Sequence, residues 1–481
     1  MHNRFQIRSA TRVAFCLALL LIALPPNVAA QTAPITIRLA GDEWFLHALT
    51  GTGLIDSYER ESGVRVQVIF KNDRAILGEL DKASDENKKG DDAPFDLIVV
   101  RHRFLGALVE KHEVQPIDSF LADRSLHDPA FRPEQQLYAN WWKELSSYKG
   151  QIYGYPFTAL TAYLCYRKDL LADPANRRDF LAQFHRQLRP PRNWKEYSEL
   201  AQFFNRPDQH FYGTYIQGKQ SLALWYEWLN FIYAFGGNVL DAKHGWQYGD
   251  IVVNSPQNLS ATQQYLKLIA FSPPDTLTYG WNEAQSALQQ GHVFMGILWS
   301  DQAPFLEDPK VSRVAGKIGY ALIPSNSAQQ FSQLEGLTYL ITAKSQHARE
   351  AYKFLEWTQS QRVQVAQTLR GSSSIRKATY HDPDVAKLPY TAAFLASLPI
   401  AKPKATVPES DAMTQAAVRH LSEIVSGKTS AQQGLDALAV EMQRILNGKA
   451  RLHYPVKQLA KLFVNVERTS TSAHFIPFRF L

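Results

Sequence analysis

The feature that most constrains the fold is an alternation of strand and helix patterns over residues 35–109. Residues 35–40, 64–70 and 95–100 have strand patterns, and segments with apolar residues at helical spacing separate them. This order is typical of a parallel sheet with helices on its faces. Ligands of such sheets bind beyond the carboxyl ends of the strands. We therefore expect a binding crevice near residues 42–44 and near Arg101 and His102.

A passage of the chain from one domain to another is predicted at residues 149–171, KGQIYGYPFTALTAYLCYRKDLL. Gly150, Gly154 and Pro156 precede an apolar, aromatic strand over residues 162–166. Such punctuation after a long strand and helix alternation often marks a domain crossing. The alternative is a turn and a buried strand inside one domain. The length of 481 residues suggests roughly two or three domains.

Residues 1–30 have the organisation of a secretory signal peptide. Arginines 4, 8 and 12 precede an apolar run over residues 13–24, and a Val-Ala-Ala site ends at Ala30. The run is too short to span a bilayer comfortably. We expect cleavage after Ala30 and export of a soluble protein to the periplasm, with an uncleaved membrane anchor as the alternative.

Cysteine content and net charge argue against a disulfide-bonded fold, a cysteine nucleophile and a nucleic-acid-binding protein. Cys16 lies in the expected signal peptide, so Cys165 alone remains and no intramolecular disulfide can form. A single Cys in an apolar strand is more typical of a small buried hydrophobe than of a nucleophile. Loss of the signal peptide lowers the formal net charge from +7 to +4, which is too small and too dispersed to indicate nucleic-acid binding.

The second half of the chain is rich in aromatic residues. A helix over residues 222–235 carries Trp225 and Trp228, and Trp281 precedes another helix. A buried strand over 293–299 delivers Trp299 and Asp301 to its carboxyl end. Strands at 318–322 and 337–341 flank a predicted turn at Glu335 and Gly336. Helices are expected over 348–368, 413–425 and 430–446.

Several motifs in one order resemble a known family, the extracellular solute-binding proteins of sugar-type ABC importers, which include the maltose-binding proteins. The motifs are the strand at 96–100, GQIYGYP at 150–156, YRKDLL at 166–171, PRNWKEY at 191–197, GHVFM at 291–295 with Trp299, AREAYKFL at 348–355, IRK at 375–377 and DPDV at 382–385. Together they cover most of residues 35–446.

The resemblance implies an α/β, two-lobed periplasmic-binding-protein fold of type II. Each lobe would be a mainly parallel sheet flanked by helices, with the ligand cleft between the lobes. Lobe 1 would comprise residues 31–150 and 317–370, and lobe 2 residues 151–316 and 371–447. Closure of the lobes would bury the solute. The implied partners are a small-molecule solute of the sugar class and the permease subunits of an ABC importer in the inner membrane. No cofactor and no metal is implied, and we expect a monomer.

The chain departs from the family pattern in two places. Serines stand at 372–374, in a loop where many members have a proline. Residues 448–481 extend past the usual final helix and carry Lys and Arg residues against a single acid, Glu467. A solvated or back-packed tail is one interpretation, and a docking segment for a membrane or a partner protein is the other.

A cleft for a neutral sugar needs carboxylates or amides for its hydroxyls and aromatic rings for its C–H face. The candidates lie at predicted strand ends, turns and the crossing, and core packing is the alternative for each tryptophan. They are Glu43, Trp44, Arg101, Tyr155, Phe157, Trp225, Trp281, Trp299, Asp301, Glu335 and Gly336. Trp44 and Trp299 are favoured because a carboxylate lies close to each in sequence at a strand's carboxyl end.

Sequence motifs for phosphate binding, metal binding and hydrolysis are incomplete or absent. Gly427-Lys428-Thr429 resembles the end of a phosphate loop, but Ser422 replaces the first Gly and no strand precedes it. The chain has no paired-cysteine metal motif and no G-x-S-x-G elbow. An iron site formed by Tyr153 and Tyr155 is an alternative to sugar binding, but their spacing and the sugar-type motifs disfavour it.

The sequence therefore predicts a periplasmic binding protein that captures a carbohydrate or polyol-bearing solute and hands it to a permease, without catalysis. One alternative is a sensor or scaffold of the same fold that signals to a membrane or secreted partner. Another is a glycosidase with Asp301 and Glu335 as its carboxylate pair, which would need them roughly 5–10 Å apart.

Overall fold

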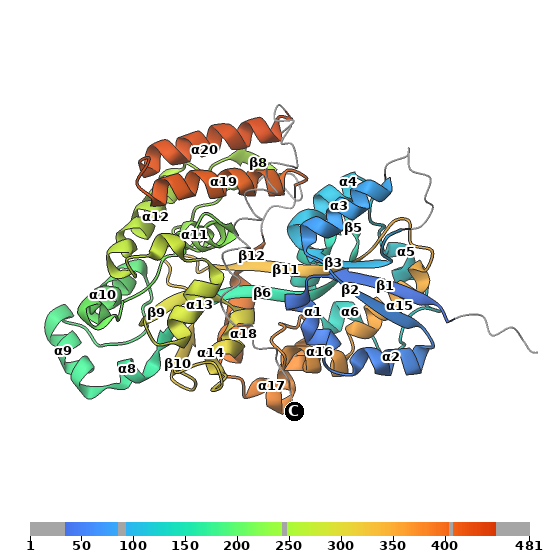
Figure 1. The fold of residues 1–481 in the computed structure, drawn as a ribbon, viewed down its shortest axis with the longest axis horizontal. Coiled ribbons are helices and arrows are strands. Elements are labelled where there is room, and N and C mark those ends of the chain that lie inside the picture. Colours follow the sequence, from blue (N-terminus) through green and yellow to red (C-terminus); the bar gives the residue numbers. More distant parts are fainter. Residues whose placement is uncertain (1–33, 85–92, 243–247, 404–406, 449–481) are drawn as a thin grey trace, which may run out of the picture.

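A computed structural model describes residues 34–84, 93–242, 248–403 and 407–448, so the expected signal peptide and most of the basic tail lie outside the described residues. The molecule has two lobes joined by long strands that run through its middle (Figure 1). The predicted two-lobed α/β fold is confirmed. Among the described residues, no helix is long and apolar enough to cross a membrane.

Lobe 1 is built on three parallel strands, β1 (Thr36–Gly41), β2 (Arg65–Phe70) and β3 (Leu97–Arg101). β1 lies in the middle and pairs with both neighbours, so their carboxyl ends share one edge. β3 is buried on both faces, which explains its continuous apolar run. The helices of this lobe are α1 (Glu43–Thr50), α2 (Leu54–Ser62), α3 (Asp73–Ser84), α4 (Leu105–Glu110), α5 (Asp118–Ala122), α6 (Pro133–Gln136), α7 (Ala139–Ser146), α15 (Ala348–Thr358) and α16 (Gln361–Thr368).

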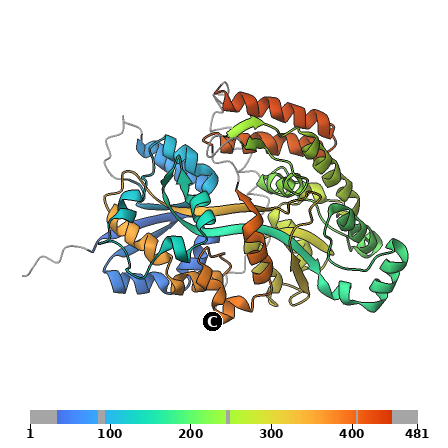
Figure 2. The ribbon, with the colours of Figure 1, turned by 180° about the vertical axis from the view of Figure 1, so that it is seen from behind.

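Two long strands join the lobes. The first half of β6 (Gly154–Arg167) pairs with β11 (Ser332–Ile341), and β11 also pairs with β3 of lobe 1. The second half of β6 pairs with β9 (Met295–Trp299) and β10 (Ile318–Ala321) of lobe 2. Seen from behind, β6 and β11 again cross between the lobes (Figure 2). The stretch in which we expect a crossing is thus one strand shared by two groups of strands.

Lobe 2 differs from lobe 1 in strand direction. We expect a mainly parallel sheet there too, but β9 and β10 both run antiparallel to β6. The two-stranded pair β4 (Ser147–Tyr148) and β5 (Gln151–Ile152) lies in lobe 1 beside α3 and α4 (Figure 1), and the remaining strands are β7 (Leu240–Ala242), β8 (Tyr248–Ile251) and β12 (Ala401–Pro403). The remaining helices are α8 (Lys168–Ala172), α9 (Pro174–Phe184), α10 (Trp194–Phe204), α11 (Leu222–Ala234), α12 (Pro256–Lys267), α13 (Trp281–Gln289), α14 (Ala303–Glu307), α17 (Pro383–Ala386), α18 (Thr391–Ser397), α19 (Ser410–Val425) and α20 (Ala431–Leu446).

Two local predictions are wrong. Glu335 and Gly336 do not form a turn but lie inside β11, paired with Leu160 and Ala159 of β6. The helix expected over 348–368 is two helices, which break at Gln359 and Ser360. In the first case the strand continues through the expected turn, and in the second an expected continuous helix is interrupted.

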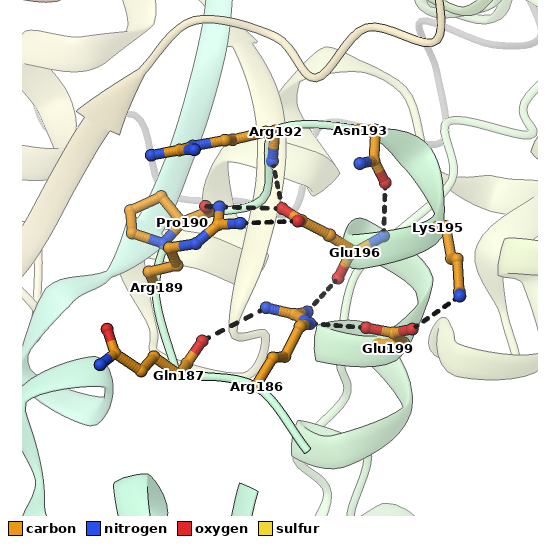
Figure 3. Close-up of polar contacts among 9 residues, drawn as sticks. All are labelled: Arg186, Gln187, Arg189, Pro190, Arg192, Asn193, Lys195, Glu196 and Glu199. Carbon is orange, nitrogen blue, oxygen red and sulfur yellow. Dashed lines mark hydrogen bonds and ion pairs between the residues drawn. The ribbon is translucent and has the colours of Figure 1, made fainter. Parts of the chain in front are cut away.

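A network of charged side chains organises the loop before α10 (Figure 3). The N-cap Asn193 accepts a hydrogen bond from the backbone N–H of Glu196, and the Glu196 carboxylate accepts from the Arg189 guanidinium. Arg186 pairs with Glu199 at 2.7 Å. Because these carboxylates already have cationic partners, the cluster stabilises the loop and the helix start, and it does not line the cavity described next.

Candidate functional site

A cavity of about 170 Å³ lies between the lobes, at the carboxyl ends of β3 and β9. Its walls come from α1 and β3 of lobe 1, from the crossing strands β6 and β11, and from α11, α13 and the end of β9 in lobe 2. The lining residues are Asp42, Trp44, Phe45, Arg101, Leu160, Tyr226, Trp281, Asn282, Trp299, Asp301, Gln302 and Glu335. The position matches the crevice expected from the strand order.

The wall from lobe 1 combines an aromatic ring with a fixed cation. Asp42 caps α1 by accepting a hydrogen bond from the Trp44 N–H at 3.0 Å, which directs the first turn of the helix into the cavity. The Arg101 guanidinium pairs with Asp73 and lies 5.3 Å from the centre of the Phe45 ring. Burial lowers the pKa of Arg101, but the carboxylates of Asp73, Glu335 and Asp42 together outweigh burial, so the pKa is raised overall and the group keeps its charge.

The wall from lobe 2 is an aromatic cluster. The Tyr226 ring lies 5.6 Å from that of Trp299, in an edge-on arrangement, and 6.0 Å from that of Trp281. Gln302 fixes both tryptophans, because its side chain donates to the Trp281 carbonyl and accepts from the Trp299 N–H. This wall offers rings against which the C–H face of a sugar can pack.

Two polar atoms in the lining have no hydrogen-bond partner among the described residues. They are Nε1 of Trp281, a donor, and Oδ1 of Asp301, an acceptor, and both are buried. Burial raises the pKa of the Asp301 carboxyl, although its hydrogen bond from Trp44 acts in the opposite direction. A buried polar group without a partner is costly, so the lining holds one donor and one acceptor that are both available for a hydrogen bond.

Glu335 is held by donors from both lobes. Its Oε1 lies 2.8 Å from Nδ1 of His102, and its Oε2 accepts from the Tyr226 hydroxyl at 2.5 Å. Burial would raise the pKa of Glu335, but His102 and the nearby Arg103 and Arg101 outweigh burial and lower it. The group is therefore a fixed carboxylate in the cavity wall.

Direct contacts across the mouth of the cavity join the lobes. Nε1 of Trp44 donates to Oδ2 of Asp301 at 3.3 Å, and the Trp44 ring stacks on Phe305 with centroids 5.3 Å apart. Trp44 is still 42% exposed, as expected for a residue at the rim. The described conformation is thus a closed one, with the tryptophan of α1 lying against lobe 2.

The structure brings together six of the residues predicted from sequence, and all six line the cavity: Trp44, Arg101, Trp281, Trp299, Asp301 and Glu335. This location is what a ligand-binding role requires, and the role itself stays a prediction.

The other five predicted residues lie outside the lining. Tyr155 stacks on Trp142, and Phe157 packs edge-on against Tyr339, both in the core. Trp225 stacks on Trp228. Glu43 is exposed at the start of α1. A Cβ atom on Gly336 would lie 2.8 Å from the Thr158 carbonyl oxygen, so this glycine permits close strand packing.

Sequence reasoning did not select half of the lining: Asp42, Phe45, Leu160, Tyr226, Asn282 and Gln302. Asp42 had a usable signal, because it stands at the expected rim and is a typical N-cap residue. Tyr226 is one residue from the chosen Trp225, and neighbouring residues of a helix point about 100° apart. Within the described residues, no group of His, Cys, Asp and Glu could hold a metal ion.

Comparisons with known proteins agree with this architecture. The family model for bacterial extracellular solute-binding proteins matches residues 53–365. A mannitol-binding protein from Pseudomonas aeruginosa is 27% identical over 393 residues, which cover 75% of this chain and 82% of the relative.

Solved structures of solute-binding proteins share the fold. One, an ABC transporter protein from Agrobacterium radiobacter in complex with ribitol, has a TM-score of 0.71 and 23% identity, and the match covers 85% of this chain and 98% of that protein. Another, from Agrobacterium vitis with bound D-mannitol, has a TM-score of 0.68 and 20% identity, covering 86% of this chain and 99% of the other.

Proposed function

The chain belongs to the family of bacterial extracellular solute-binding proteins, and from that premise we propose that it captures a small polyol or monosaccharide between its lobes for delivery to the permease of an ABC importer. The solute would bind in the periplasm, to a monomer. The lobes would comprise residues 31–150 with 317–370 and residues 151–316 with 371–447.

The observation that carries the proposal is the pair of buried, unpartnered atoms in an aromatic cavity. A hydroxyl both donates and accepts, so one hydroxyl can donate to Oδ1 of Asp301 while another accepts from Nε1 of Trp281. The rings of Trp299 and Tyr226 would pack against the carbon skeleton. A purely apolar solute would leave both atoms without a partner.

Cavity size and charge narrow the class of solute. An engineered cavity of roughly 150 Å³ holds a molecule the size of benzene, so about 170 Å³ suits a single sugar or a short polyol better than an oligosaccharide. Arg101, the cation of the lining, is already paired with Asp73, whereas the Asp301 carboxylate keeps an acceptor oxygen without a partner. This balance favours a neutral solute over a sugar phosphate or an aldonate. The mannitol and ribitol ligands of similar proteins have the same chemistry.

Other functions have weaker support. In a glycosidase, Glu335 would need a free oxygen for catalysis, but both of its oxygens already accept hydrogen bonds from His102 and Tyr226. A sensor that acts through the basic tail would depend on residues outside the described ones, and no contact of the described lobes favours it.

Ligand-induced thermal stabilisation tests the proposal. The mature protein, from residue 31 onward, is heated with D-mannitol, ribitol, D-tagatose, maltose, gluconate and mannitol 1-phosphate. We expect a raised midpoint with one of the first three, confirmed by calorimetric titration with one site per chain. Stabilisation by the anions or by maltose alone would contradict the assigned charge and size, and no response to any of the six would refute capture of a small polyol or monosaccharide.

A further inference from the structure

Three consecutive residues at the end of β3 connect different parts of the molecule. Arg101 lines the cavity, His102 contacts Glu335 of the crossing strand β11, and Arg103 reaches lobe 2. Nη1 of Arg103 donates to the Tyr226 hydroxyl at 2.9 Å, and its guanidinium lies over the Phe104 ring at 4.4 Å. Arg103 is only 5% exposed, so a positive charge is buried at the junction of the lobes.

Tyr226 joins this contact to the cavity. Its ring forms part of the cavity wall, while its hydroxyl accepts from Arg103 and donates to Glu335. A solute that packs against the ring therefore fixes the hydroxyl to which Arg103 binds. The network includes lobe 1, the crossing strand and lobe 2 through three side chains.

A second contact of Arg103 is incomplete. Its Nε and Oδ1 of Asp411, on α19 of lobe 2, lie 4.0 Å apart, and both atoms are buried without a hydrogen-bond partner among the described residues. Hydrogen bonds of this kind are about 2.7–3.2 Å long. A further approach of the lobes by roughly 1 Å would therefore satisfy both atoms at once. Oδ2 of Asp411 already accepts from Arg74 of α3 at 3.3 Å, at the exposed rim.

We propose that Arg103 is the positioning residue that holds the lobes closed over an occupied cavity, through Tyr226 and, in the solute-bound state, through a completed ion pair with Asp411. The proposal rests on the proposed function, because the cavity must bind a solute. A buried cation with an unsatisfied donor is unfavourable, so the closed state is favoured most when both partners are in place. Arg103 and Asp411 do not line the cavity, so they would act on affinity indirectly, Arg103 through Tyr226 and closure and Asp411 through closure.

Dissociation kinetics test this proposal, with D-mannitol as the probe and tryptophan fluorescence as the signal. We expect Arg103→Met, Tyr226→Phe and Asp411→Asn each to raise the dissociation rate about 10- to 100-fold, as for loss of a hydrogen bond to a charged group, with association rates within about threefold of wild type. The matched control is Arg74→Gln, which breaks only the exposed half of the Asp411 interaction and should change the rate less than about threefold. Circular dichroism confirms that each variant is folded.

The separation of the lobes gives an independent readout. Spin labels are attached through Asp56→Cys on α2 and Lys195→Cys on α10, both exposed, and Cys165 is buried and unreactive. D-mannitol should shift the wild-type distance distribution to the closed value, and Arg103→Met and Asp411→Asn should retain a large open fraction at saturation.

The outcomes separate the two proposals. Wild-type dissociation rates and distances in Arg103→Met and Asp411→Asn would overturn the closure role while the proposed function stands. If the wild-type protein does not bind D-mannitol, D-mannitol is not its solute, and the closure role is then tested by the spin-label distances of the ligand-free proteins. Loss of the closed population in Arg103→Met then supports the role, and identical distributions overturn it.

Discussion

Replacing Asp301 by Asn should stabilise the ligand-free protein and weaken solute binding at the same time. Burial raises the pKa of this carboxyl, so its ionised form at neutral pH opposes folding. Asn has nearly the same shape, keeps one oxygen for Trp44 Nε1 and removes the charge. Proton binding decides whether Asp301 stabilises or destabilises the fold. A carboxyl whose pKa is raised in the folded state stabilises that state at low pH, and this stabilisation is lost as the pH rises through the folded-state pKa. An Asn side chain does not ionise, so the variant does not lose this stability at neutral pH.

The expected loss of solute affinity in Asp301→Asn follows from the Oδ1 acceptor, which has no partner among the described residues. A hydrogen bond to a charged group contributes about 1.5–3 kcal/mol, so its loss should weaken binding roughly 10- to 150-fold. At a solute concentration of about 100 times the wild-type Kd, stabilisation would fall from about 2.7 to about 0.4 kcal/mol for a roughly 100-fold loss. For roughly 400 residues these energies correspond to midpoint shifts of about 3 °C and about 0.5 °C.

The assay is thermal unfolding at neutral pH with and without the solute found in the panel. The matched control is Asp169→Asn, a carboxylate of lobe 2 that pairs with Arg167 outside the cavity, and its solute-induced shift should equal that of wild type. A full wild-type shift in Asp301→Asn would show that Oδ1 does not bind the solute. A lower ligand-free midpoint than wild type would refute the argument that the buried charge opposes folding.

Four further substitutions test other parts of the site and fold. Trp281→Phe keeps an aromatic ring but removes the Nε1 donor, so calorimetric titration should show about 3- to 10-fold weaker binding. Trp225→Phe should leave the Kd within about twofold of wild type, because Trp225 stacks on Trp228 outside the cavity; a larger loss would return Trp225 to the site. Burial raises the pKa of Glu227 from 4.5 to about 7, so the contribution of this group to stability is present below about pH 4.5 and is lost as the pH rises through about 7. In Glu227→Gln the thermal unfolding midpoint should therefore fall less between about pH 4.5 and about 7 than in wild type. An unchanged pH dependence of the midpoint would contradict the raised pKa of Glu227. Gly336→Ala should lower the free energy of unfolding in urea by about 1–3 kcal/mol, because its Cβ would meet Leu145 and the Thr158 carbonyl, and an unchanged value would show that the strands can separate there.

The sequence by itself determined the first sheet and much of the cavity rim. Strand alternation predicts β1, β2 and β3, and the carboxyl-end rule selects Trp44, Arg101, Trp299 and Asp301, all of which line the cavity. The predictions for Trp44 and Arg101 succeed because they depend on local periodicity and on a rule that holds for parallel sheets, whereas Trp299 and Asp301 follow a strand that pairs antiparallel with β6. The crossing strand was predictable from another local signal, the Gly and Pro residues that precede it.

Only the tertiary structure decided which side chains face the cavity and how the lobes meet. Trp225 and Tyr226 are neighbours with similar chemistry, and the packing of α11 alone determines that Tyr226 faces the cavity. The strand direction in lobe 2 and the approach of Arg103 to Asp411 depend on segments far apart in the chain. Such contacts leave no periodic pattern, because a pairing between distant residues is fixed by the whole fold and not by spacing in the sequence.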